Sequence, residues 1–170
     1  MLWHVFFIAA KWTKNSLLPQ RSGLLDCSTQ TPLPDYYLSK IWTKLMGSGV
    51  LGTVVLDGPR TVRAYAHCAA DDTRDVVVLL LNLAEKAIEI DLVVGSNTIK
   101  AARTEWHFTA GEDGLGGTGV RLGGKELVWV PGQALPPMEG VSKEPSNPVR
   151  LAQHSIVFVR LPGVAPVGLC

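Results

Sequence analysis

The chain has 170 residues, of which 46% are hydrophobic and 18% charged, and this length and composition allow a substantial core. Its formal net charge of +1 gives no reason to expect nucleic acid as a partner. At the N-terminus, the apolar run MLWHVFFIAA is too short to span a bilayer. Two interpretations of this start stay open: a poor signal peptide, since no basic residue leads the run, or a non-native beginning.

The segment LPDYYLSKIWTKLMGSGVL predicts one helix, over residues 35–46, followed by the start of a strand. Apolar residues recur there every four positions and line one face of a helix, as Tyr37 and Leu38, Ile41 and Trp42, and Leu45 and Met46. Pro34 and Asp35 suit a first helical turn, and Gly47 suits the stop. Such a face is stable only against a large apolar partner, and none is evident in the sequence that follows.

The remainder of the chain is typical of strands separated by turns. The predicted strands lie in residues 61–69, 75–84, 87–94, 103–110, 126–132 and 154–162. The uninterrupted apolar run 76–81 is typical of a strand covered on both faces, whereas residues 62–67 and 88–92 alternate as half-buried strands do. The Pro-rich run 131–148 is expected to form one long surface connection. Short strands at this spacing predict a mainly β fold, an antiparallel β-sandwich.

Cysteine and histidine residues give no metal or cofactor site by their spacing. Cys27, Cys68 and Cys170 are odd in number and form no C-x-x-C motif, which argues against zinc. The histidines are scattered along the chain, at His4, His67, His107 and His154. His67 and His107 lie on alternating strands, where surface or hydrogen-bonded histidines are expected rather than ligands. We therefore predict no metal-binding, cofactor-binding or catalytic role for them.

The acidic residues and the glycine-rich segment do not indicate a particular reaction either. Glu105 and Glu112 are conceivable as an acid/base pair, but both lie near a strand-to-turn region without a positioned partner, so a solvated role is predicted. The GLGGTG run at residues 114–119 lacks the Lys-Ser/Thr of a phosphate loop and reads as a hairpin loop. The chain also lacks a G-x-S-x-G nucleophile motif. We therefore predict no catalytic residue in this chain.

Several ordered motifs resemble the heparanase family, glycoside hydrolase family 79, and especially its plant heparanase-like branch. They are GLL at 23–25, PLPDYY at 32–37, WTKLMG at 42–47, VRAYAHCA at 62–69, LLLNL at 79–83, EWHFTA at 105–110, LGGKEL at 122–127 and HSIVFVRLP at 154–162. The resemblance covers residues 23–170, and residues 1–22 take no part. It implies a remnant of a (β/α)₈ barrel at residues 23–49, including the helix, and a C-terminal β-sandwich domain at 50–170.

The resemblance further implies that the helix is the last one of that barrel, with residues 47–50 as the hinge into the sandwich. Its apolar face would then pack on the missing catalytic barrel through Tyr37, Leu38, Ile41, Trp42 and Leu45, and would be exposed in this chain. The family's two catalytic glutamates lie on barrel strands upstream of the matched region and have no counterpart here. In the family, the cysteines at the places of Cys68 and Cys170 pair, which implies an oxidising compartment and leaves Cys27 as a free thiol.

Two classes of function follow from these expectations. The chain is either the C-terminal part of a hydrolase acting on β-glucuronide bonds of uronic-acid-containing glycans, inactive without its barrel, or a non-catalytic β-sandwich that binds a glycan or a partner. By resemblance, its place is the secretory pathway, the extracellular space, the lysosome or vacuole, or a membrane surface. No cofactor is expected.

Overall fold

The computed structural model describes residues 23–71, 73–94, 97–98, 102–144, 148–165 and 170, so the predictions for residues 1–22 lie outside the described part. It contains helix α2 (Pro34–Leu45) and a short 3₁₀ turn, η2 (Gly114–Gly116). The strands are β1 (Met46–Leu51), β2 (Val62–Ala69), β3 (Val76–Asn82), β4 (Ile88–Ile90), β5 (Val93–Val94), β6 (Asn97–Thr98), β7 (Arg103–Ala110), β8 (Val120–Leu122), β9 (Lys125–Glu126), β10 (Val141–Lys143), β11 (Val149–Leu151) and β12 (Ser155–Leu161).

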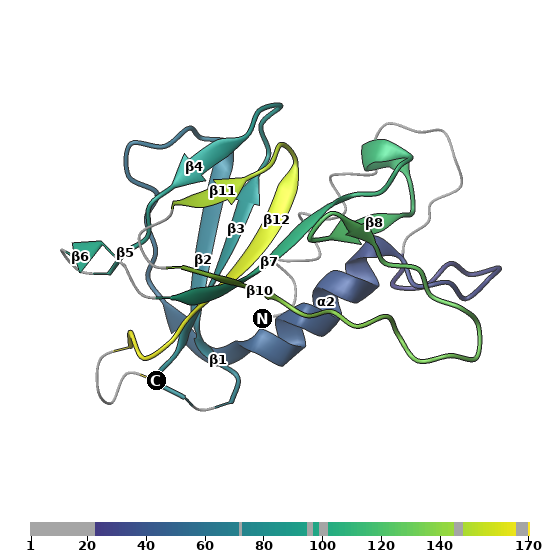
Figure 1. The fold of residues 1–170 in the computed structure, drawn as a ribbon, viewed down its shortest axis with the longest axis horizontal. Coiled ribbons are helices and arrows are strands. Elements are labelled where there is room, and N and C mark those ends of the chain that lie inside the picture. The colour runs from purple at the N-terminus through teal and green to yellow at the C-terminus, as the bar shows by residue number, and fades with distance from the viewer. Residues whose placement is uncertain (1–22, 72, 95–96, 99–101, 145–147, 166–169) are drawn as a thin grey trace.

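Most strands form one antiparallel sheet (Figure 1) in the order β1-β2-β3-β12-β7-β8-β9, and β10 pairs with β7 beside β8. β4 and β11 form a separate two-stranded sheet, and β5 pairs with β6. The prediction of a mainly β, antiparallel fold is confirmed. The large sheet is open, and among the described residues the β4–β11 pair forms the second β layer on it.

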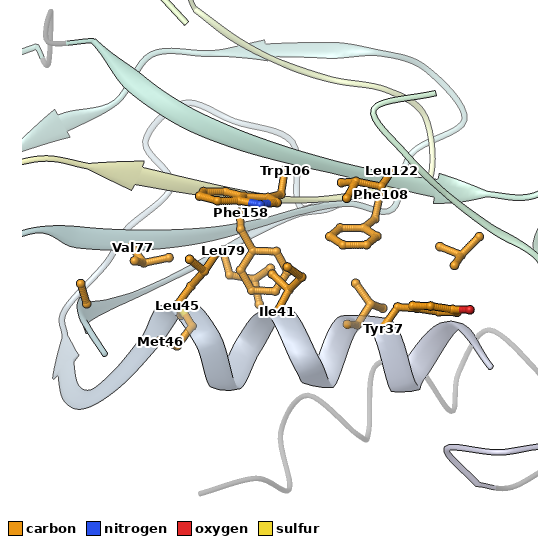
Figure 2. Close-up of a cluster of buried hydrophobic side chains, with 13 residues drawn as sticks. Tyr37, Ile41, Leu45, Met46, Val77, Leu79, Trp106, Phe108, Leu122 and Phe158 are labelled. Carbon is orange, nitrogen blue, oxygen red and sulfur yellow. The ribbon is translucent and has the colours of Figure 1, made fainter. Parts of the chain in front are cut away.

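Helix α2 covers one face of the large sheet. Figure 2 shows Tyr37, Ile41 and Leu45 pointing from the helix toward the aromatic rings on β7 and β12. We call this cluster the helix-side core; its buried residues are Tyr37, Leu38, Ile41, Leu45, Met46, Ala69, Val77, Leu79, Trp106, Phe108, Val120, Leu122 and Phe158. The helix therefore finds its apolar partner within this chain.

This packing corrects the prediction that the helix face would meet a missing barrel. Tyr37, Leu38, Ile41 and Leu45 are buried against the chain's own sheet, and Trp42 is half-buried, its ring edge-on to His67 with centroids 5.2 Å apart. The predicted exposed stripe is absent because β3, β7 and β12 each present apolar side chains on this face. An apolar stripe shows that a helix has a partner, but the stripe does not show which one.

The opposite face of the large sheet packs against β4 and β11. This second cluster, the far-side core, contains Val62, Ala66, Val76, Val78, Leu80, Val149, Leu151, Val157, Val159, Leu161 and Ala165. β3 contributes alternately to both clusters, and all seven of its residues are buried. The prediction that this apolar run forms a strand covered on both faces is confirmed.

Local departures from the predicted elements have simple causes. Residues 47–50, predicted as a hinge, belong to β1, which pairs with β2. Of the predicted strand 126–132, only Glu126 is in a strand. Leu127 still donates its backbone N–H to the carbonyl oxygen of Val120, and the strand pairing ends there. The predicted connection 131–148 includes β10, whose pairing with β7 no local pattern reveals. The 87–94 strand is divided into β4 and β5.

Candidate functional site

Polar side chains line the face of β7 that points away from the helix. Trp106 and Phe108 lie in the helix-side core, so Arg103, Glu105 and His107 project from the other face of the strand. On the neighbouring strand β12, Val159 and Val157 stand opposite Glu105 and His107 and belong to the far-side core. The polar row therefore borders an apolar cluster.

Glu105 is the centre of this row. Its Oε1 accepts a hydrogen bond from Nε of Arg103 at 2.6 Å, and its Oε2 lies 2.6 Å from Nε2 of His107. Only 3% of the Glu105 and Arg103 side chains is exposed, against 25% for His107. The Arg103–Glu105 ion pair is thus buried, and His107 at the end of the row is partly exposed.

The surroundings hold Glu105 in its charged form. Burial by itself raises the pKa of a carboxyl group, but hydrogen bonds and charge interactions with His107 and Arg103 together outweigh that effect and lower the pKa of Glu105. A carboxylate with a lowered pKa, both of whose oxygens are engaged, is a poor general acid. The arrangement favours a structural role.

These positions correct one prediction and confirm another. Glu105 was expected to be solvated and is buried, because β10 and β12 flank β7 at this point. His107 has a hydrogen-bonding partner, as expected, and so has His67, whose Nδ1 lies 2.7 Å from the carbonyl oxygen of Gly47. Arg103 was missed, although the alternation R-x-E-x-H opposite Trp106 and Phe108 was available as a signal.

Glu112 does not join this row. Its side chain is 81% exposed and accepts a hydrogen bond from Arg121 at 3.0 Å, at the edge of the β7–β8 hairpin. The glycine-rich segment around η2 connects these two strands, which confirms the predicted hairpin loop. The two glutamates considered as an acid/base pair therefore have different partners and different exposure.

A second polar cluster ties the end of β12 to the β2–β3 turn. Arg160 donates to the carboxylates of Asp75 and Asp71 at 2.7 and 2.8 Å, and Oδ1 of Asp75 accepts from the backbone of Gly163 at 2.9 Å. Arg74 in the same turn donates to the carbonyl oxygen of Ala165. These contacts fasten the last described stretch of the chain to the sheet.

The cysteine pairing implied by the resemblance is present in the structure. Cys68 at the end of β2 is bonded to Cys170, and the bridge closes a separation of 102 residues. Cys27 is exposed and free. The bridge and the Arg160 cluster both secure the C-terminal segment.

The described residues contain no group of three or more His, Cys, Asp or Glu side chains placed to hold a metal ion. In the same part of the chain, no helix is both long enough and apolar enough to cross a membrane.

Fold and side chains together define a mainly β domain with an integral helix, whose polar clusters have structural partners. No family model matches the chain. It is 34% identical over 148 residues to baicalin-beta-D-glucuronidase of Scutellaria baicalensis, and the matched region covers 87% of this chain and 28% of that protein. It is 29% identical over 177 residues to heparanase-like protein 3 of Arabidopsis thaliana, covering 90% of this chain and 33% of that one.

These matches confirm the resemblance: over most of its length, the chain is similar to members of the heparanase family. It spans a third or less of the length of these two relatives, at 28% and 33%. Among solved structures, that of BuGH86wt in complex with neoagarooctaose covers 67% of this chain and 15% of its own, at 15% identity and a TM-score of 0.41. A TM-score this low supports no conclusion about function.

Proposed function

We propose that this chain is the C-terminal β portion of a heparanase-type glycoside hydrolase that acts on β-glucuronide bonds, and that the chain alone is inactive. The observation that carries the proposal is the extent of the matches, which include most of this chain but only 28% and 33% of the two relatives. A (β/α)₈ barrel needs roughly 200 or more residues. The described residues are instead committed to an antiparallel sheet and the helix on it.

The side chains support inactivity of the isolated chain. Hydrolysis of a glycosidic bond uses two carboxyl groups flanking that bond, one of them an acid whose pKa is raised. The pKa of Glu105 is lowered instead, and its oxygens are held by Arg103 and His107. Glu112 is exposed and paired with Arg121. Neither glutamate is suited to be the acid.

The remainder of such a hydrolase would have to contact surfaces other than the helix stripe. Tyr37, Leu38, Ile41 and Leu45 are already buried in the helix-side core, so a barrel that packs on this domain would use side chains outside this cluster. The disulfide supports a place in the secretory pathway or outside the cell, because such bonds persist in oxidising compartments.

An activity assay tests the proposal. The purified chain, incubated with an aryl β-D-glucuronide, is expected to release no aryl alcohol above the blank, while a full-length plant β-glucuronidase serves as the positive control. Turnover that survives repurification would contradict the proposal. Sequencing the transcript upstream of the Met1 codon provides an independent check, since an in-frame extension encoding a barrel with two glutamates is expected. A stop codon directly upstream would favour a separate non-catalytic β-sandwich that binds a glycan or a partner.

A further inference from the structure

An uncharged apolar segment lies exposed at one edge of the large sheet. Residues 50–56, with the sequence VLGTVVL, contain neither a charged residue nor proline. Val54 is 80% exposed and Leu56 75% exposed, and Val50 is exposed as well. Sheet edges in soluble proteins usually carry a lysine, a proline or a covering element, and this segment lacks such protection among the described residues.

The backbone of this segment is also open to a new strand. β1 is the terminal strand of the sheet, so its outer side has no partner strand within the described residues. Beyond Leu51, residues 52–56 continue beside β2, where the side-chain hydroxyl of Thr53 donates to the carbonyl oxygen of Ala64 at 3.0 Å. The described structure gives the backbone groups of residues 52–56 no hydrogen bond. Unpaired donors and acceptors therefore coincide with exposed apolar side chains.

We propose that residues 50–56 form a self-pairing edge, which binds the same segment of a second copy of this chain in an antiparallel strand pair. Two identical strands pair around a twofold axis. A residue a given number of positions before the axis in one copy therefore stands opposite the residue the same number of positions after it in the other copy. With the axis at Thr53, Val50 stands opposite Leu56 of the other copy, and Gly52 opposite Val54. The second copy is favoured because the segment complements itself.

This register is favourable in side-chain packing and in charge. In a strand that continues through residue 56, Val50, Val54 and Leu56 share one face, so the most exposed side chains of both copies would cover each other. The nearest charged residue, Asp57, stands opposite Gly49, so no like charges meet. Short, uncharged segments of high β-propensity are the ones that associate in this way.

Sedimentation velocity of the oxidised chain over a wide concentration range tests the proposal. We expect a monomer–dimer equilibrium, and the substitution Val54→Lys should raise its dissociation constant at least tenfold, because two lysines would be brought into the apolar contact. Val128→Lys is the matched control, since Val128 is 67% exposed in the loop after β9, away from this edge. The control should leave the dissociation constant within twofold of the parent.

Hydrogen exchange keeps the test informative if a variant folds poorly. In the unsubstituted chain, amides 52–56 should gain protection as the concentration rises, and in Leu56→Lys they should stay unprotected. A chain that is monomeric at every concentration measured would overturn the proposal. In that case, a strand of another protein would be the candidate partner for this edge. Oligomers of equal strength in the Val54→Lys variant, or higher assemblies without protection of residues 52–56, would overturn it too.

Discussion

Among single residues, Glu105 is expected to matter most for stability, because its carboxylate contacts two basic side chains, Arg103 and His107, on one face of β7. Its side chain and that of Arg103 are each only 3% exposed. A buried ion pair adds little net stability by itself, since bringing the charges out of water is costly. Loss of one member, in contrast, is strongly destabilising, because it leaves the other charge poorly compensated.

The substitution Glu105→Gln is therefore expected to lower the free energy of unfolding by about 3–5 kcal/mol. Glutamine keeps the shape of the side chain but supplies one acceptor oxygen, whereas Arg103 and His107 each contact a separate oxygen now. Glu112→Gln is the control, expected to change stability by less than about 0.5 kcal/mol because Glu112 lies on the surface. Urea unfolding of both variants measures the difference, and equal losses would contradict the buried role of Glu105.

The same carboxylate predicts a pH dependence. Because the pKa of Glu105 in the folded chain is below its ordinary value of 4.5, the stability that its charge contributes is complete above that pH. It is lost as the pH falls through the lowered pKa of the folded state. The difference in unfolding free energy between the parent and Glu105→Gln should thus narrow as the pH falls below 4.5, because only the parent titrates this group. Urea titrations across this range measure it, and a gap that stays constant or widens would refute the assignment.

At the scale of elements, α2 belongs to the core of this domain. Its apolar side chains share the helix-side core with residues of β3, β7 and β12, as Figure 2 shows for Val77, Phe108 and Phe158. β1 follows the helix without an intervening loop and pairs with β2. Helix and sheet are therefore expected to unfold in one transition.

Ile41→Ala tests this integration. Ile41 is fully buried in the helix-side core, so truncation should leave a cavity and cost about 2–5 kcal/mol of stability. Lys40→Ala, one position earlier on the exposed side of the helix, should change stability by less than about 0.5 kcal/mol. Circular dichroism and tryptophan fluorescence followed during urea unfolding provide the measurement. A fluorescence transition unchanged by Ile41→Ala would indicate that the helix is not part of this core.

The elements that carry a strong local pattern could be predicted from the sequence. Helix α2, the doubly covered strand β3 and the strands β7 and β12 were found within one or two residues, because their apolar periodicity reflects burial directly. β8 and β10 were missed, since three-residue strands are defined by their pairing with β7 and not by a pattern of their own. The burial of Glu105 escaped prediction for the same reason.

On the scale of the whole molecule, the C-terminal segment is held to the sheet at two places. The Arg160 cluster joins it to the β2–β3 turn, and the Cys68–Cys170 bridge joins the chain's last residue to the end of β2. The family resemblance predicted this bridge, whereas the spacing of three cysteines alone left the pairing open. The resemblance to the family thus predicted a long-range contact that the local sequence pattern does not encode.

This bridge is expected to be a large contributor to stability. Closing a separation of 102 residues restricts the unfolded chain by about 4–5 kcal/mol in the chain-entropy model. Cys170→Ser should lower the free energy of unfolding by up to that amount, and a reductant should lower the parent to the same level while leaving Cys170→Ser unaffected. Cys27→Ser is the control, because Cys27 is exposed and free. Urea unfolding with and without reductant measures the effect, and peptide mapping without reduction should recover a linked Cys68–Cys170 peptide. A parent insensitive to reductant, or a peptide linking Cys27 to either cysteine, would contradict the role of the bridge.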